Sequence, residues 1–178
     1  MIFLRHPRPE VPAGTCYGRM DIGVGPEGEA DIERALAETP RLMRIIASPA
    51  LRCRGLAEAL AARDGVALSF DPRLWELNFG DWEGMPWDLI RRSDSDRWAA
   101  DPWRIAPPGG ETFAEVHARV GAVLAEASPE TALVCHAGPI RAARMIATGA
   151  SYDTVLAEAV PYATAIRFAP AAKMGEQV

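Results

Sequence analysis

Five residues whose side chains can bind an anion, attack it or move a proton follow short apolar segments of this chain. Arg5 and His6 come directly after the opening run MIFL, and His136 directly follows the run TALVC. Arg52 lies shortly after the segment RIIA, and Glu76 lies shortly after VALSF. The chain holds only three histidines, so two of them in equivalent positions need an explanation.

The chemistry that these residue types share is phosphoryl transfer. Arginine guanidinium groups donate planar pairs of hydrogen bonds to phosphate oxygens. One histidine can attack phosphorus through a neutral ring nitrogen, and the other can stabilise the charge that develops on an oxygen. A glutamic acid can donate a proton to the leaving oxygen. Each residue alone is more often a solvent-exposed or capping residue, so the inference depends on all five together.

The elements that must position these residues alternate between strand and helix. Apolar runs predict strands at 1–5, 44–47, 66–70 and 131–135, and a last strand is expected at 163–168. Propensity and periodicity predict helices at 27–38, 50–63 and 138–148, with another near 86–99. We expect no regular element from Pro170 onward. This alternation predicts an α/β domain whose mainly parallel sheet is covered on both faces. Ligands of such sheets bind beyond the carboxyl ends of the strands, which is where the five residues fall.

Two further segments carry clear local signals. Residues 7–26 contain so many prolines and glycines that they exclude a helix or a central strand. A loop of this length inside a compact domain is usually functional or disordered. Thr112 and Glu115 fit a capping box, and Phe113, Val116 and Val120 follow at helical spacing. A helix is therefore expected to begin at this point.

Composition limits the possible classes of protein. The chain has 178 residues, which suits one domain over 1–178. Its net charge of −5 argues against nucleic-acid binding. The three cysteines form no CxxC pair, which argues against a disulfide framework or a zinc site. No run is apolar and long enough to span a membrane, and no secretory signal is visible, so we expect a cytoplasmic protein.

Five stretches, in order, resemble the motifs of the histidine phosphatase superfamily, also called the phosphoglycerate-mutase-like family. LRHP at 4–7 resembles its L-R-H-G motif, and ASPALRCRGLAEAL at 47–60 resembles its second motif, in which an arginine comes four residues after a serine. WELNFGDWEG at 75–84 resembles the segment with the acid glutamate, and PPGGETFAEV at 107–116 resembles a Pro-Gly-Gly-Glu-Ser element. VCHAGPIRA at 134–142 resembles the Ser-His-Gly-Gly-x-x-Arg motif. The ordered set is far more specific than any single stretch.

The resemblance implies a fold, a reaction and roles for individual residues. The fold would be a three-layer α/β/α sandwich with a mainly parallel central sheet. The reaction would be metal-independent hydrolysis of a small-molecule phosphate ester through a phosphohistidine, with no cofactor. His6 would be the nucleophile, Glu76 the proton donor, and Arg5, Arg52 and His136 the phosphate pocket.

Departures from the family pattern concern the substrate more than the reaction. Pro7 and Ala137 replace the glycines that follow the two histidines, and the usual T-x-x-N run is absent. The stretch RPEVPAGTCYGRMD at 8–21 stands in its place, and its G-x-C-Y-G-R-x-D pattern resembles the α-ribazole phosphatase-like branch, which acts on a cobalamin-pathway phosphate. We expect Ala137, Tyr17 and Arg19 to contact the substrate. Tyr17 and Arg19 could equally well fix the loop itself.

Several alternatives remain open from the sequence. A phosphoglycerate mutase would use the same nucleophile, although this chain is short for that branch. A non-catalytic phosphate-binding domain is the alternative from a different class of protein. All five tryptophans fall within 75–103, where packing of an irregular segment is favoured over an aromatic rim around the pocket. The sequence does not distinguish a monomer from a homodimer.

Overall fold

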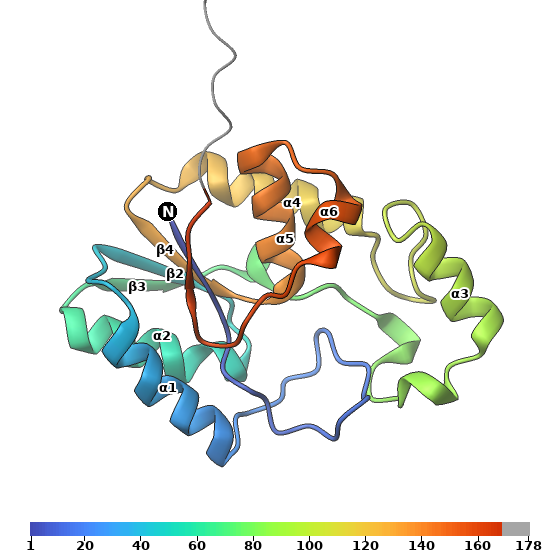
Figure 1. Ribbon diagram of the computed structural model, residues 1–178, viewed down its shortest axis with the longest axis horizontal. Coiled ribbons are helices and arrows are strands. Elements are labelled where there is room, and N and C mark those ends of the chain that lie inside the picture. The colour runs from blue at the N-terminus through green and yellow to red at the C-terminus, as the bar shows by residue number, and fades with distance from the viewer. Residues whose placement is uncertain (169–178) are drawn as a thin grey trace, which may run out of the picture.

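A single mixed sheet forms the centre of the molecule (Figure 1). The computed structural model describes residues 1–168, so the expectation for the stretch from Pro170 lies outside the described residues. The strand order is β3-β2-β4-β1-β5. Four strands run parallel, namely β1 (Ile2–Arg5), β2 (Arg44–Ala47), β3 (Ala67–Phe70) and β4 (Thr131–Cys135). The fifth, β5 (Ala165–Ile166), pairs antiparallel with β1 at the edge.

Helices cover both faces of the sheet, because the inner strands β1 and β4 are apolar on both sides. Ile2 and Leu4 of β1 pack into the same core cluster as side chains of α1 (Pro26–Glu38) and α2 (Leu51–Asp64). Phe3, which points to the opposite face, packs into a second cluster with α4 (Phe113–Glu126) and α5 (Ala137–Thr148). The expected three-layer α/β/α sandwich is thereby confirmed.

Local signals set the helix ends where the sequence predicts them. The Thr112 hydroxyl accepts a hydrogen bond from the Glu115 N–H at 3.2 Å, and the Glu115 carboxylate accepts one from the Thr112 N–H at 2.7 Å. The capping box at the start of α4 is thus complete. Helix α2 ends at Gly65, whose φ of 67° is a left-handed conformation that glycine adopts without strain.

The expected helix near 86–99 is wrong in its first half. A 3₁₀ turn spans Trp87–Leu89, and helix α3 begins only at Arg92 and runs to Ala100. Ile90 is extended, with φ −72° and ψ 130°, and its side chain is buried in a small cluster with Cys16 and Trp82. Burying Ile90 is therefore incompatible with an uninterrupted helix through this segment.

The C-terminal part of the described chain also differs from the expectation. The strand expected at 163–168 contains only the two residues of β5. Ala163 lies in the left-handed region with φ 46°, which interrupts the extended backbone before β5. A short helix, α6 (Tyr152–Ala157), precedes it and was not predicted from the sequence.

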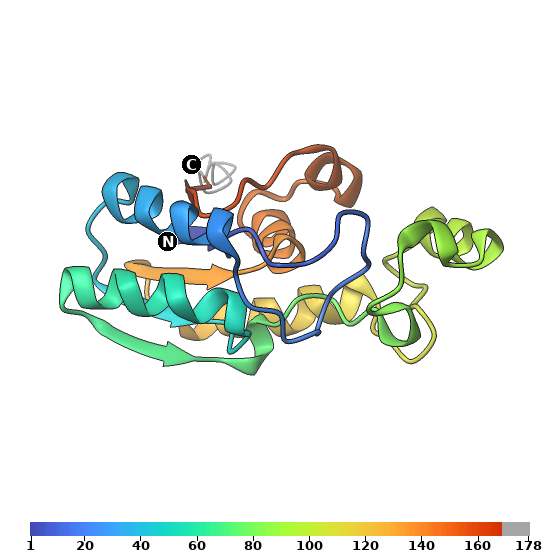
Figure 2. The same cartoon turned by 90° about the horizontal axis from the view of Figure 1, so that it is seen from below.

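The loop at 7–25 is tied to a segment that we call the aromatic arm, residues 79–98. The Cys16 N–H donates to the Met85 carbonyl at 2.8 Å, and the Gly84 N–H donates to the Cys16 carbonyl at 2.8 Å. The arm extends away from the sheet, as Figure 2 shows. Cys16 of the loop is completely buried in a cluster with Trp82 and Ile90 of the arm, so the two segments share one small core. Within residues 1–168, no helix has the length and apolar character needed to cross a membrane.

Candidate active site

The two histidines meet because β1 and β4 are neighbours in the sheet. Arg5 pairs with Cys135 in the strand register, so the next residues, His6 and His136, leave the sheet at the same edge. The backbone N–H of His6 donates to the Cys135 carbonyl at 2.8 Å, and the ring centroids of His6 and His136 are 5.1 Å apart. His6 is 1% exposed and His136 is fully buried.

The hydrogen bond of His6 fixes which ring nitrogen is free. Its Nδ1 lies 2.6 Å from the Pro7 carbonyl oxygen, which can only accept a hydrogen bond. Nδ1 therefore carries the proton, and Nε2 keeps its lone pair. Burial lowers the pKa of His6 well below its ordinary value of 6.5, the Arg52 charge lowers it further, and the bond to Pro7 opposes this only in part. A neutral ring with a free Nε2 is the form that a nucleophile requires.

Arg52 and Arg5 each leave one nitrogen without a partner. Arg52 is fully buried and donates to the carbonyl oxygens of Met20 at 2.7 Å and Gly18 at 2.5 Å. Arg5 donates to the Val160 carbonyl at 2.9 Å. The Nε of Arg5 and the Nε of Arg52 are both buried, and neither finds an acceptor in the part of the chain that the structure describes.

His136 supplies a third buried nitrogen of this kind. Its Nε2 lies 2.8 Å from the Ser48 hydroxyl, which also accepts from the Ala50 N–H at 3.4 Å. When the Ser48 hydroxyl donates its hydrogen to Nε2, the proton of the neutral ring lies on Nδ1. That Nδ1 has no partner among residues 1–168. Burial, followed by the charge of Arg52, lowers the pKa of His136 well below 6.5.

Three buried nitrogens without partners, on side chains close to the His6 imidazole, describe an anion site. A buried donor left unpaired costs about 1–3 kcal/mol, so a cluster of such donors calls for a ligand with several acceptor oxygens. A phosphoryl group offers those oxygens and the negative charge that two arginines attract. Among residues 1–168, no group of three or more histidines, cysteines, aspartates and glutamates is arranged to hold a metal ion.

Glu76 lies at the N-terminus of α5, next to His136. Its carboxylate accepts hydrogen bonds from the N–H of Gly138 at 3.1 Å and from the N–H of Leu77 at 2.9 Å. A Cβ at position 138 would collide with this carboxylate, so the glycine permits the close approach. Arg119 donates to the Glu76 carbonyl at 3.1 Å and thereby fixes the backbone at this position.

The three residues expected to contact the substrate lie in different surroundings. Ala137 is the first residue of α5, directly follows His136 in the sequence and is buried. The Tyr17 ring lies 5.5 Å from the Arg52 guanidinium, and burial raises the pKa of Tyr17 to about 12. Arg19 forms an ion pair with Glu111 at 3.1 Å and is partly exposed. The structure therefore ties Arg19 to another element, and it brings Tyr17 close to the phosphate-pocket residues.

Sequence reasoning left three neighbours of this site without a role. Ser48 follows β2, and the strand-end rule that identified His6 could have assigned it. Trp75 stacks nearly parallel to His136, with ring centroids 6.2 Å apart. Tyr162 lies with its ring centroid 5.6 Å from that of His6, and no sequence signal marked it. Trp82, Trp87 and Trp98 instead pack against one another in the arm.

Comparison with known proteins identifies the class. The model of the histidine phosphatase superfamily (branch 1) matches residues 1–174. The chain belongs to the histidine phosphatase superfamily.

Its relatives are named for different activities. Glucosyl-3-phosphoglycerate phosphatase of Mycolicibacterium vanbaalenii is 32% identical over 129 residues, covering 65% of this chain and 54% of that protein. Phosphoserine phosphatase 1 of Hydrogenobacter thermophilus is 28% identical over 153 residues, covering 80% and 72%. A bifunctional protein of Mycobacterium tuberculosis is 31% identical over 127 residues, covering 67% of this chain and 35% of that protein. The match therefore spans only about a third of that mycobacterial relative.

Solved structures share the fold over most of the chain. The native structure of mycobacterial glucosyl-3-phosphoglycerate phosphatase superposes with a TM-score of 0.77 at 25% identity, covering 87% of this chain and 82% of that one. A protein of Thermus thermophilus superposes with a TM-score of 0.72 at 27% identity, covering 92% and 89%.

The lowered pKa values predict a stability that depends on pH. Below about pH 6.5 both histidines take up protons in the unfolded chain but stay neutral in the folded one. The free energy of unfolding should therefore fall as the pH is lowered, by up to about 2.7 kcal/mol per pH unit from these two groups. Urea denaturation between pH 5 and 7 measures this slope. The double variant His6→Gln/His136→Gln should give a shallower slope, and an equal slope would contradict the assignment.

The surroundings of Gly18 and Gly23, two glycines of the loop at 7–25, predict that alanine affects stability very differently at the two positions. A Cβ at position 18 would collide with the Leu77 carbonyl, whereas a Cβ at position 23 would meet nothing within 4 Å. Gly18→Ala should therefore lower the free energy of unfolding by about 1–3 kcal/mol. The collision would push the Gly18 carbonyl away from the Arg52 guanidinium, which donates to it. Gly23→Ala should change it by less than about 0.5 kcal/mol. Equal stability of the two variants in urea denaturation would show that this contact does not fix the loop.

Proposed function

We propose that this protein is a metal-independent phosphomonoesterase that hydrolyses a small phosphate ester through a phosphohistidine at His6. One observation carries the proposal: Nε2 of His6 is free, and three buried nitrogens on side chains close to His6 also lack partners among the described residues, namely Arg5 Nε, Arg52 Nε and His136 Nδ1. Donors fixed in this way before the ligand arrives stabilise the charge that develops on the phosphoryl oxygens without having to reorganise.

The reaction proceeds in two steps, formation of the phosphohistidine and its hydrolysis. Nε2 of His6 attacks phosphorus, the bond from phosphorus to the ester oxygen breaks, and that oxygen takes a proton from the Glu76 carboxyl group. A water molecule then attacks the phosphohistidine and gives a proton to the Glu76 carboxylate. The P–N bond breaks, inorganic phosphate leaves, and the Nε2 lone pair returns. The position of Glu76 beside His136, at the start of α5, supports this role.

Hydrolysis is favoured over the two alternatives. A mutase would have to retain the intermediate while it reorients, and the chain lacks the longer insertion of that branch. Two of the relatives are phosphatases by name, which supports release of phosphate to water. Phosphate release with a single substrate present separates a phosphatase from a mutase. Tight binding of phosphate esters without turnover would identify a non-catalytic domain.

The substrate proposal depends on the loop at 7–25. Its G-x-C-Y-G-R-x-D pattern supports α-ribazole 5'-phosphate, and hence a role in cobalamin biosynthesis in the cytoplasm. Two relatives are named for glucosyl-3-phosphoglycerate and phosphoserine, so these two phosphomonoesters belong in the same assay panel. The ratio of kcat/KM among the three substrates tests the proposal directly, and a clear preference for either of the other esters would replace it.

The nucleophile is tested by removing one histidine at a time. His6→Ala should abolish hydrolysis of p-nitrophenyl phosphate in excess EDTA, because no other free imidazole nitrogen faces the donors. His117→Ala is the matched control, since His117 packs 5.2 Å from Trp103, away from this set, and should retain activity. After reaction with a ³²P-labelled ester, wild type and His117→Ala should carry an acid-labile ³²P label on the protein, and His6→Ala should carry none. Activity retained by His6→Ala would overturn the assignment.

The proton donor is tested by varying the leaving group. Glu76→Gln should slow hydrolysis of an alkyl phosphate by roughly 10²–10⁴-fold, because an alkoxide leaves poorly without a proton. Hydrolysis of p-nitrophenyl phosphate should fall far less, since its leaving group is stable as an anion. A single-turnover measurement of the first step with both esters makes the comparison. An equal loss with both esters would remove Glu76 from this role.

A further inference from the structure

His6 is almost completely covered in this structure. Its exposed fraction is 1%, and Arg52 and His136 are both at 0%. An opening of this size is too small to admit a phosphate ester, so part of the cover must move before any reaction occurs. The side chains that lie over His6 and the arginines identify which part that is.

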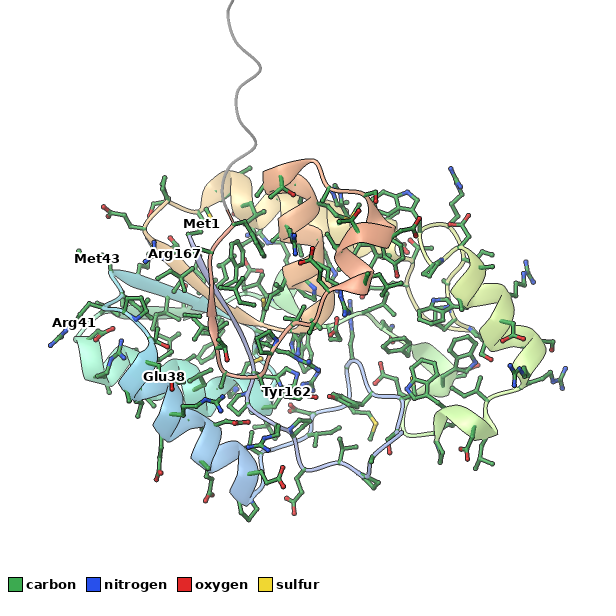
Figure 3. The ribbon with its side chains drawn as sticks, viewed as in Figure 1. Met1, Glu38, Arg41, Met43, Tyr162 and Arg167 are labelled. Atoms are coloured by element: carbon green, nitrogen blue, oxygen red, sulfur yellow. The ribbon has the colours of Figure 1, made fainter. Side chains whose placement is uncertain are left out.

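Two tyrosines from distant parts of the chain cover the site. The Tyr162 ring lies 3.7 Å from the Arg5 guanidinium, and its centroid is 5.6 Å from the His6 ring. The Tyr17 ring faces Arg52 at 5.5 Å. The two phenol oxygens are 3.3 Å apart, although the residues are separated by 145 positions. Figure 3 labels Tyr162, which lies where the C-terminal segment passes the loop at 7–25.

The backbones beside both tyrosines are anchored, so the side chains are the movable part. Arg34 donates to the Tyr162 carbonyl at 3.0 Å, and the Ala163 N–H donates to the Arg5 carbonyl at 3.0 Å. On the other side, the Cys16 N–H and the Gly18 carbonyl are both hydrogen-bonded. The bond between the phenols is long for two hydroxyl groups, whose usual separation is about 2.5–3.0 Å. Rotation of one ring would break it without disturbing the backbone.

There is solvent space next to Tyr162 to receive a ligand. Tyr162 lines an open groove of about 550 Å³, together with Arg8, Asp31, Arg34, Pro161 and Thr164. The same residue thus borders both the groove and His6.

We propose that Tyr17 and Tyr162 determine which molecules reach His6, because their paired phenols form a gate over it. The gate follows from the burial and the contacts of these side chains. That the admitted molecule is a phosphate ester rests on the proposed function. A wide organic group requires a larger separation of the two rings than a narrow one, so the pair also sets the size preference of the site.

The first test measures access to His6 without using turnover. Diethyl pyrocarbonate modifies neutral imidazole nitrogens, and peptide mass spectrometry gives the modification rate of each histidine separately. Tyr17→Phe and Tyr162→Phe each remove the phenol–phenol hydrogen bond and keep the ring. Each variant should speed modification of His6 by about 2- to 10-fold. This is the factor by which the loss of one hydrogen bond raises the fraction of molecules whose two rings are apart.

The double variant separates a pair from two independent residues. Because both single changes remove the same bond, Tyr17→Phe/Tyr162→Phe should react no faster than either single variant. Tyr152→Phe is the matched control, since Tyr152 packs on Phe113 and should leave the His6 rate unchanged. The rate at His117 should stay constant in every variant, which reports an intact fold. An unchanged His6 rate in both single variants, or additive increases in the double variant, would overturn the gate.

The second test measures the size preference. Tyr162→Ala should raise the ratio of kcat/KM for 1-naphthyl phosphate to that for phenyl phosphate by about 10-fold, the order of discrimination that pocket size gives. Tyr162→Ala also changes the surroundings of Arg5, which can lower kcat/KM for both esters equally. Such a common loss does not change the ratio. An unchanged ratio would overturn the specificity role. If wild type hydrolyses neither ester while the modification rates behave as expected, the proposed function fails and the gate stands.

Discussion

The buried guanidinium of Arg52 is the constraint on which the rest of the site depends. It is fully buried and forms no ion pair among the described residues, and its two terminal nitrogens are held by the carbonyl oxygens of Gly18 and Met20. An uncompensated buried charge costs several kcal/mol, which carbonyl dipoles offset only in part. Burial and, after it, this positive charge keep both histidines neutral, and the charge favours an anion at this position.

The sheet topology places the other groups around this charge. Strands β2, β4 and β1 lie side by side, so Ser48, His136 and His6 leave the sheet at one edge. Ser48 orients His136, and the Pro7 carbonyl orients His6. Each imidazole is therefore held by a partner on one nitrogen, and its other nitrogen has no partner among the described residues. Both histidines and Arg5 come from strand ends, Arg52 comes from α2, and Glu76 and the two tyrosines come from irregular segments.

The features that the sequence could predict are those with a local cause. Strands β1, β2 and β4 are marked by short apolar runs, and the capping box of Thr112 and Glu115 is complete within four residues. The start of α3 could not be predicted, because it depends on Ile90 entering a cluster with residues far away in sequence. The ion pair of Arg19 with Glu111 spans 92 positions, and the place of Tyr162 depends on a two-residue strand. No local pattern records such long-range contacts.

The shared core of the loop at 7–25 and the aromatic arm has a consequence for how this protein can diversify. Cys16 is buried among arm residues, and backbone hydrogen bonds with Met85 and Gly84 join the two segments on both sides of it. A loop transplanted from a relative would leave Trp82 and Ile90 facing a hole or a clash. Changes in substrate range therefore have to be inherited as matched pairs of segments, and chimeras that exchange both together are the ones that will fold.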